Sequence, residues 1–321
     1  MIKTSCHRGF THITLENDLV RVVLLPEVGG KIISLVRVAS AREYLLRLPE
    51  DEAFREPHFG GVFVDYNNVG FDECIPTIAP CTYPDSSFTG RRLPDHGDVW
   101  SLPWHYEVRE RNLLLSVEGR SLPYSFHKRL CLGDQGLKIE YEVRNRSDAA
   151  LCYLWSAHPL LHPEPGASVL LPLDSATLLV DSSKYGRLGS RGDQCGWPIA
   201  VQKDGTSDDL RRIKPHADTS DKLYTPRLPR GCCGLYYPST HESLLFKFDI
   251  ESVPYVGIWI CNGGTGRLNP KEPYTVALEP CNGRPDSLAD AMRRGENAVL
   301  SPNQRKRWDL RVELLEGLPA V

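Results

Sequence analysis

Long apolar segments are missing from this 321-residue sequence. A membrane-spanning helix needs about 18 or more consecutive apolar residues, and no run in the chain approaches that length. The opening residues, MIKTSCHRGF, also lack an apolar stretch of the length that a signal peptide requires. We therefore predict no contact with a membrane and expect a cytoplasmic protein.

An excess of either charge is missing as well. The 38 lysine and arginine residues are balanced by 41 acidic residues, which gives a net charge of −3. Nucleic-acid-binding proteins gather their basic residues in a patch or stripe, whereas here they are scattered among acidic ones. The sequence therefore predicts no nucleic-acid partner.

Cysteine pairs with metal-binding or redox spacing are absent, although the chain contains 10 cysteines. No two of them have the C-x-x-C spacing of a zinc ribbon or a thioredoxin motif. Disulfide frameworks are typical of short secreted chains, so we expect free thiols. His158 and His162 are four residues apart, but each precedes a proline that favours extended backbone, which separates them as metal ligands. We predict no metal site.

Helical patterns and nucleotide-binding loops are scarce. Neither G-x-G-x-x-G nor G-x-x-x-x-G-K-[ST] occurs, and few strand-like segments are followed by a helical pattern, which excludes Rossmann and P-loop folds. Residues 287–294 (SLADAMRR) are the exception. Ser287 is a suitable N-cap and Gly295 a suitable end, so we predict one short helix near the C-terminus.

The chain does contain the material of a large β-sheet core. Hydrophobic residues make up 41% of it, and 26 glycines and 25 prolines separate short segments rich in alternating or β-branched residues. Apolar and charged side chains alternate in residues 137–143 (LKIEYEV), as in a half-buried antiparallel strand. Similar segments lie at residues 19–25, 112–118, 151–155, 243–248, 255–261 and 308–314. The pattern predicts an all-β fold with sandwich or barrel layers.

One stretch, at about residues 181–230, shows almost no strand pattern and is dense in Gly, Pro, Ser and Asp. We predict a loop insertion there. Such a loop is either a solvated connector or part of a binding site, because long loops on a rigid β scaffold often shape one. No shift in composition marks a domain boundary, and no internal repeat is evident.

Three short segments concentrate groups that can transfer protons: residues 95–98 (DHGD), 156–159 (SAHP) and 278–283 (LEPCNG). Taken alone, each histidine or glutamate is compatible with an ordinary surface or hydrogen-bonded residue. Their order along the chain, and the segments around them, indicate that the three belong to one site.

The chain resembles the aldose 1-epimerase family, the galactose mutarotase-like proteins. Five segments carry the resemblance in order: LLPEVGGKI, HGDVWSLPW, LWSAHPLL, IWICNGG followed by VALEPCNG, and DSLADAMRRG preceding LSPNQRKRWDLRVEL. They span roughly residues 18 to 316. The resemblance implies one domain over residues 1–321, a large antiparallel β-supersandwich with a short C-terminal helix. The segment GFDECIP is closer to a divergent branch of the family.

The resemblance also implies a catalytic site. In this family two histidines and a glutamate meet over the anomeric end of a pyranose, which here correspond to His96, His158 and Glu279. His96 would polarise the ring oxygen, His158 would protonate it, and Glu279 would take the proton of the C1 hydroxyl. Opening a cyclic hemiacetal needs one base and one acid on the same ring, and it needs no cofactor. We expect Glu279 to hold His158 partly protonated.

Other residues are candidates for contacts with the sugar. Asp72 and Glu73 in GFDECIP, and Asp98 in the first histidine segment, can supply polar contacts. Trp259 either stacks on the apolar face of a sugar or belongs to the core. The family's substrate-binding aspartate has no clear counterpart, which leaves the sugar open. Arg91 and Arg92 keep a sugar phosphate among the alternatives.

The sequence thus predicts a cofactor-independent mutarotase that acts on a monosaccharide as a monomer or homodimer. Two alternatives share the scaffold: a non-catalytic carbohydrate-binding or sensing protein, and a hexose-phosphate epimerase. A metal-dependent β-barrel enzyme of the cupin type would need clustered histidines.

Overall fold

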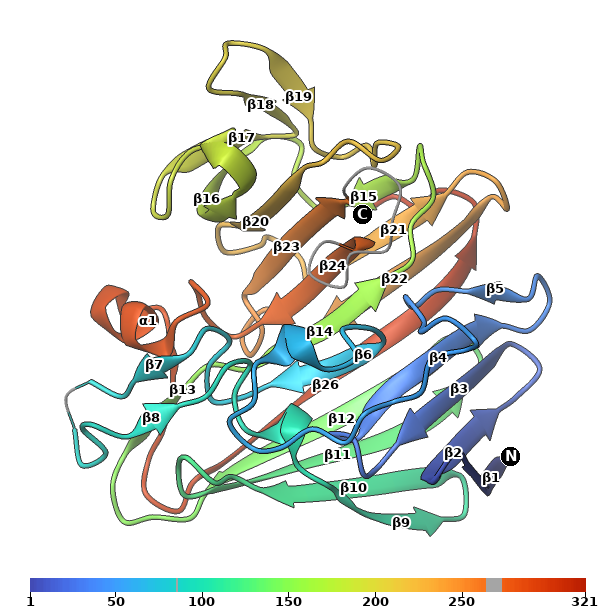
Figure 1. Cartoon of the computed structure of the whole chain (residues 1–321), viewed down its shortest axis with the longest axis vertical. Helices are drawn as coiled ribbons and strands as arrows, with labels where there is room; N and C mark the ends of the chain where they lie inside the picture. Colours follow the sequence, from blue (N-terminus) through green and yellow to red (C-terminus); the bar gives the residue numbers. More distant parts are fainter. Residues whose placement is uncertain (85, 264–272) are drawn as a thin grey trace.

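The computed structural model describes residues 1–84, 86–263 and 273–321, and the regular structure in them is almost entirely antiparallel strand (Figure 1). Gly264, the last residue of the IWICNGG segment, lies outside the described residues. Among the described residues, 12 strands form a larger sheet and 8 form a smaller one. One extended apolar cluster joins residues of both sheets. The predicted all-β supersandwich is confirmed.

The larger sheet has its strands in a spatial order that differs from the chain order. The order is β1 (Ile2–His7), β2 (Phe10–Glu16), β3 (Val20–Leu25), β4 (Lys31–Arg37), β6 (Phe71–Cys74), β14 (Ser156–Leu161), β24 (Tyr274–Cys281), β23 (Tyr255–Asn262), β20 (Ser220–Tyr224), β16 (Ala176–Ser183) and β17 (Gln194–Trp197). A short strand, β5 (Arg42–Glu43), pairs with β4. This order brings β6, β14, β24 and β20 close together although the sequence separates them widely.

The smaller sheet contains the clearest alternating segments. Its order is β15 (Ser168–Leu170), β21 (Cys232–Tyr237), β22 (Glu242–Phe248), β26 (Arg305–Glu316), β12 (Gly136–Asn145), β11 (Tyr124–Gly133), β10 (Asn112–Glu118) and β9 (His105–Arg109). In β12, Ile139 and Tyr141 are buried in the core while Glu140 and Glu142 lie on the opposite face. The period-2 prediction for this strand is confirmed.

Short elements complete the described chain. They are three strand pairs, β7 (Cys81–Thr82) with β8 (Arg92–Leu93), β13 (Leu151–Tyr153) with β25 (Ala298–Leu300), and β18 (Ile199–Val201) with β19 (Ser207–Asp209), and three 3-10 turns, η1 (Phe63–Asp65), η2 (Val99–Ser101) and η3 (Lys184–Gly186).

The predicted helix is present as α1 (Leu288–Arg294), which lies beside β7 and β13 (Figure 1). The Ser287 hydroxyl accepts a hydrogen bond from the Asp290 N–H, and Gly295 ends the helix in the left-handed conformation. None of the described helices is long and apolar enough to cross a membrane.

The stretch at about 181–230 differs from the predicted loop, because it contains β17 to β20. β20 (SDKLY) lies between β23 and β16 within the larger sheet. Its Asp221 and Lys222 are both buried and paired with other side chains, so the apolar alternation that reveals a strand is missing. When charged residues occupy the buried positions of a strand, the hydrophobic pattern does not predict that strand.

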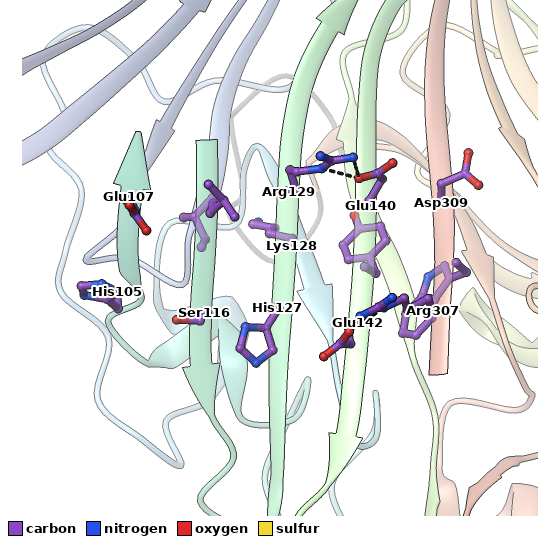
Figure 2. Close-up of a pocket in the computed structure, with 14 residues that line it drawn as sticks. His105, Glu107, Ser116, His127, Lys128, Arg129, Glu140, Glu142, Arg307 and Asp309 are labelled. Atoms are coloured by element: carbon purple, nitrogen blue, oxygen red, sulfur yellow. Dashed lines mark hydrogen bonds and ion pairs between the residues drawn. The ribbon is translucent and has the colours of Figure 1, made fainter. Parts of the chain in front are cut away.

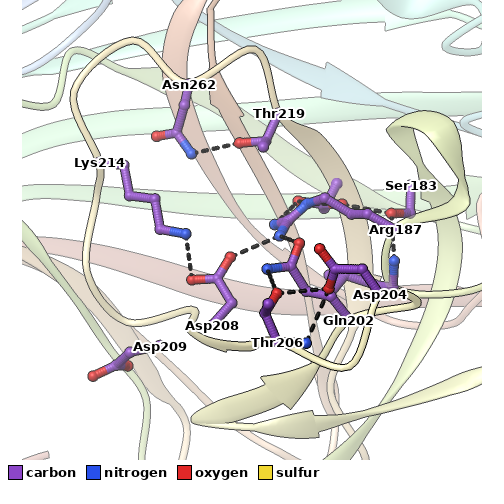
Figure 3. A network of polar contacts seen from close by, with 12 residues as sticks. Ser183, Arg187, Gln202, Asp204, Thr206, Asp208, Asp209, Lys214, Thr219 and Asn262 are labelled. Carbon is purple, nitrogen blue, oxygen red and sulfur yellow. Dashed lines mark hydrogen bonds and ion pairs between the residues drawn. The ribbon is translucent and has the colours of Figure 1, made fainter.

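A network around Arg187 ties this region to β20 (Figure 3). The Arg187 guanidinium pairs with Asp221, donates to Asp208 Oδ2 over 2.7 Å, and donates to Gln202 Oε1 over 3.1 Å. Lys214 reaches the other oxygen of Asp208 at 2.6 Å. Because Asp221 precedes Lys222, the network fixes the strand that carries that lysine.

Candidate functional site

The first group of predicted residues meets on one face of the larger sheet. His158 on β14 lies directly opposite Asp72 on β6, and directly opposite residues share a face. Glu279 on β24, the other neighbour of β14, brings its Oε1 to 3.7 Å from His158 Nε2. We call the face that carries Asp72, His158 and Glu279 the site face.

His96 reaches the same place from a loop. Its backbone has a φ of 56°, and the Gly97 that follows has a φ of 75°. A Cβ on Gly97 would come within 2.1 Å of the Ile75 carbonyl oxygen, so only glycine lets the loop lie against this part of the sheet. The imidazole of His96 contacts that of His158 edge-on at 5.1 Å between ring centroids. The structure therefore brings His96, His158 and Glu279 together, as the resemblance implied.

A segment that the sequence did not single out covers the site. Residues 46–69, which we call the cover segment, run over β14 and β24, where Leu46 and Val69 pack against Leu160 and Ala277. In η1, Phe63 stacks on His96 with ring centroids 4.1 Å apart. Consequently His158 is 4% exposed and Glu279 is 0% exposed.

The cover is held by polar contacts as well. The Phe63 N–H donates to Asp95 Oδ2 over 2.8 Å, and Asp95 Oδ1 lies 2.9 Å from His96 Nδ1. Lys31 pairs with Asp72 at 2.8 Å and donates to the carbonyl oxygens of Asn67 and Val69, each over 3.0 Å. Asp72 is thus linked to the cover through a lysine.

A second lysine in the site was missed by sequence reasoning. Lys222 on β20 pairs with Glu279 Oε2 and lies 3.6 Å from Asp286 Oδ1. The Tyr224 hydroxyl also hydrogen-bonds to Asp286. Nothing in the sequence marked Lys222, because its strand falls in the stretch predicted as a loop.

Burial has the largest effect on the pKa values of His158 and Glu279. Burial lowers the pKa of His158 well below its ordinary value, and the positive charge of Lys222 acts in the same direction. The expectation that Glu279 holds His158 partly protonated is therefore wrong: the imidazole is neutral at pH 7. Burial raises the pKa of Glu279, and the adjacent Lys222 ammonium opposes that rise.

Two residues predicted to contact a sugar have side chains that are engaged elsewhere. Glu73 follows Asp72 on β6 and so points to the opposite face, between the sheets, where Lys128 lies 2.8 Å from it. The Oδ2 of Asp98 accepts hydrogen bonds from the Ser121 N–H over 3.0 Å and the Ser121 hydroxyl over 2.9 Å. Both carboxyls hold the scaffold together, and we do not retain them as sugar contacts.

Trp259 lies on the site face. It is directly opposite Lys222 on β20, its Nε1 donates to Ser220 Oγ over 3.0 Å, and its ring packs beside the Leu160 and Ala277 cluster. Its stacking on a sugar stays a prediction. Arg91 donates to the Ser121 carbonyl oxygen over 3.1 Å, a contact that involves neither His96 nor His158.

A groove of about 780 Å³ lies elsewhere, on the outer face of the smaller sheet (Figure 2). Its charged side chains pair with one another across strands, as Arg129 does with Glu140 and Arg307 does with Glu142. None of the predicted site residues lines it. In the described part of the chain, no three His, Cys, Asp or Glu side chains gather as metal ligands would.

A small hollow lies beside the site, where the cover segment meets Lys31. The hollow between Lys31, Phe63 and Trp100 has a volume of about 10 Å³, which is enough for one water molecule. A hollow of about 150 Å³ lies beside it, between Leu46, Tyr66 and Val69. With the cover in this position, His158 and Glu279 are almost wholly buried and present no exposed surface to a monosaccharide.

Solved structures of other proteins have the same fold as this chain. No family model and no curated protein matches the sequence. Among solved structures, a galactose mutarotase-like protein from Clostridium acetobutylicum has a TM-score of 0.70 at 14% identity, covering 98% of this chain and 98% of that chain. A candidate aldose 1-epimerase from Escherichia coli K12 has a TM-score of 0.70 at 15% identity, covering 96% of this chain and 100% of that chain.

A third structure agrees with these two. The galactose mutarotase related enzyme from Lactobacillus acidophilus has a TM-score of 0.63 at 14% identity, covering 94% of this chain and 97% of that chain. The TM-scores and the coverage establish the fold, and the low identities fit the divergence that the GFDECIP segment indicated. The chain therefore has the galactose mutarotase-like fold, over nearly its whole length.

Proposed function

We propose that this protein is an aldose 1-epimerase that interconverts the anomers of a free monosaccharide in the cytoplasm. The observation that supports this best is the contact of 3.7 Å between His158 Nε2 and Glu279 Oε1, with His96 against the same imidazole. A carboxylate and an imidazole side by side supply the proton acceptor and donor that ring opening needs. The reaction needs no cofactor.

The neutral imidazole suggests how protons move. Glu279 accepts the proton of the C1 hydroxyl, the C1–O5 bond breaks as the C1 carbonyl forms, and O5 takes the N–H proton of His158. The proton on Glu279 then passes to the other ring nitrogen, so His158 changes tautomer and carries no net charge. Neither Glu279 Oε1 nor His158 Nδ1 has a hydrogen-bond partner among the described residues, so both atoms are available for this exchange.

Ring closure reverses these steps. Rotation about the C1–C2 bond presents the other face of the carbonyl, O5 attacks C1 as it loses its proton to His158, and O1 regains a proton from Glu279. For the sugar to enter, the cover segment must move away from His96 and His158, because Phe63 stacks on His96 and the side chain of His158 is almost wholly buried. We propose an open state for binding.

Anomer exchange measured by NMR on a panel of aldoses tests the proposal. The wild type should accelerate exchange of at least one neutral aldose, and Glu279→Gln should lower that rate by about 10²- to 10⁴-fold while keeping the sugar affinity. Glu142→Gln, in the groove of Figure 2, is the matched control and should behave as wild type.

The panel also separates the alternatives. A sugar that binds tightly while its anomers exchange no faster than in buffer would make the protein a carbohydrate-binding or sensing protein. Acceleration of a hexose phosphate alone would favour the hexose-phosphate epimerase. Equal rates in the wild type and in Glu279→Gln would contradict the role of Glu279.

A further inference from the structure

Lys222 is the feature of the site that the proposed proton transfers do not use. Its ammonium contacts Glu279 Oε2, which leaves Oε1 facing His158 Nε2. The side chain of Lys222 is 9% exposed and that of Glu279 is 0% exposed, so water screens this contact little. Because this buried ion pair includes the proposed general base, it must affect whether Glu279 is protonated.

The sheet is built to allow this contact. Lys222 and Glu279 lie on either side of β23, and Glu279 is directly opposite Gly257. A Cβ on Gly257 would lie 3.1 Å from Glu279 Oε2 and 3.2 Å from the Tyr224 ring. The glycine therefore leaves the gap through which the lysine reaches the carboxylate of the next strand but one.

The His158–Glu279 pair has two possible assignments of one proton. In the first, Glu279 is a carboxylate that removes the C1 hydroxyl proton. In the second, burial keeps Glu279 protonated, so it donates the proton and the neutral imidazole of His158 becomes the base. Burial alone favours the second assignment, because moving a charged carboxylate out of water costs free energy.

We propose that Lys222 decides between these assignments: its ammonium keeps Glu279 as a carboxylate and thereby makes Glu279 the base of the reaction. Lys222 acts through Glu279 and is therefore a positioning residue for charge. The base role rests on the proposed function, whereas the effect on the ionisation of Glu279 does not.

Other ionisable groups also affect the pKa of the Glu279 carboxyl. Facing Glu279 or Lys222 are His158 on β14, His96 on its loop, Cys74 on β6, Cys281 on β24, Tyr224 on β20, Asp286 after β24, and Asp181 on β16. Among them Asp286 opposes Lys222, because its negative charge raises the pKa of Glu279. Burial by itself lowers the pKa of Lys222, but Asp286 and Glu279 raise it above the ordinary value, so the ammonium stays charged.

The test is the pKa of Glu279 itself, measured by NMR of ¹³C-carboxyl-labelled glutamate, with Glu279→Gln identifying the signal. Lys222→Met should raise that pKa by about 1 to 3 units, because an opposite charge in contact has an effect of this size. Lys222→Arg keeps the charge and should leave the pKa near the wild-type value. An unchanged pKa in Lys222→Met would overturn the proposal.

A second variant keeps the test decisive if Lys222→Met does not fold. Asp286→Asn removes the carboxylate that competes for the ammonium, so the pKa of Glu279 should fall below the wild-type value. A rise or no change in this variant would also overturn the proposal. Because Lys222→Met and Asp286→Asn shift the pKa in opposite directions, general damage to the site does not reproduce the pattern.

The rate of anomer exchange adds a separate readout. In Lys222→Met, the acid limb of the pH–rate profile should move to higher pH, in step with the pKa of Glu279. If the wild type shows no exchange while the pKa shifts as expected, the proposed function fails and the effect of Lys222 on Glu279 stands. If the wild type is active and Lys222→Met changes neither the pKa of Glu279 nor the pH–rate profile, the proposed role of Lys222 is wrong and the proposed function stands.

Discussion

His158 shows how burial sets the chemistry of one residue. A histidine in water has a pKa near 6.5 and is partly protonated at neutral pH. Here the imidazole is 4% exposed, and its Nδ1 has no hydrogen-bond partner among the described residues, so the charged form lacks solvation. A neutral imidazole can both donate and accept a proton, which is the property that the proposed tautomer exchange with Glu279 requires.

We predict that His158 stays neutral as the pH falls through 6.5. Burial lowers its pKa well below the ordinary value, whereas the unfolded chain would protonate it near pH 6.5. The unfolded state therefore binds more protons below that pH, so acidification destabilises the fold through this residue. NMR of ¹⁵N-labelled histidine, with His158→Asn for assignment, should show no titration of His158 between pH 6 and 7, a range set around the ordinary value. Titration at or above pH 6.5 would contradict the account.

Residues of the site differ in how far the sequence reveals them. His96, His158 and Glu279 each belong to a segment with a recognisable order, so the resemblance located all three. Lys222 and Phe63 belong to no such segment, and their roles depend on contacts across strands and loops. Alternation in β6 separates Asp72 from Glu73, which adjacent positions in a sequence do not show until the strand is known.

At the scale of elements, patterns that depend on local periodicity were predictable. Buried and partly exposed residues alternate along β12, and α1 has a capping residue at each end. Both signals lie within a few consecutive residues, so the sequence alone shows them. β20 was not predictable, since its buried positions are filled by Asp221 and Lys222, whose burial depends on partners far away in the chain. Strands β6 and β14 are buried on both faces because the cover segment lies over the site face.

The cover segment is the element that must move before a sugar can reach His96 and His158. Phe63 stacks on His96 and lies 5.3 Å from the His158 ring, so its removal should open the site. We predict that Phe63→Ala raises the rate at which a histidine-modifying reagent reacts with His96 and His158. Truncating a buried phenylalanine costs about 3–5 kcal/mol in stability, so the comparison must be made well below the unfolding transition.

A matched control removes that ambiguity. Phe88→Ala truncates another buried phenylalanine, which packs against Tyr83 and takes no part in the site. It should lower stability in a similar way while leaving the modification rate of the two histidines unchanged. Equal modification rates in the wild type and in Phe63→Ala would mean that the cover does not limit access.

At the scale of the whole molecule, two surfaces of the described chain bear on where a sugar binds. One is the site face of the larger sheet, covered in this structure, where His158, Glu279 and Lys222 meet. The other is the groove on the outer face of the smaller sheet, where charged side chains pair among themselves (Figure 2). The fold that this chain shares with its structural neighbours accommodates both, so fold alone does not choose between them.

The crystal structure of Glu279→Gln soaked with an aldose that the wild type turns over tests the central claim most directly. The substitution keeps the shape of the site and the sugar affinity while it slows the reaction. We predict a pyranose on the site face, with its C1 hydroxyl at about 2.6–3.2 Å from the side chain at position 279 and its ring oxygen facing His158. A sugar bound in the outer groove, or with its anomeric carbon turned away from position 279, would contradict it.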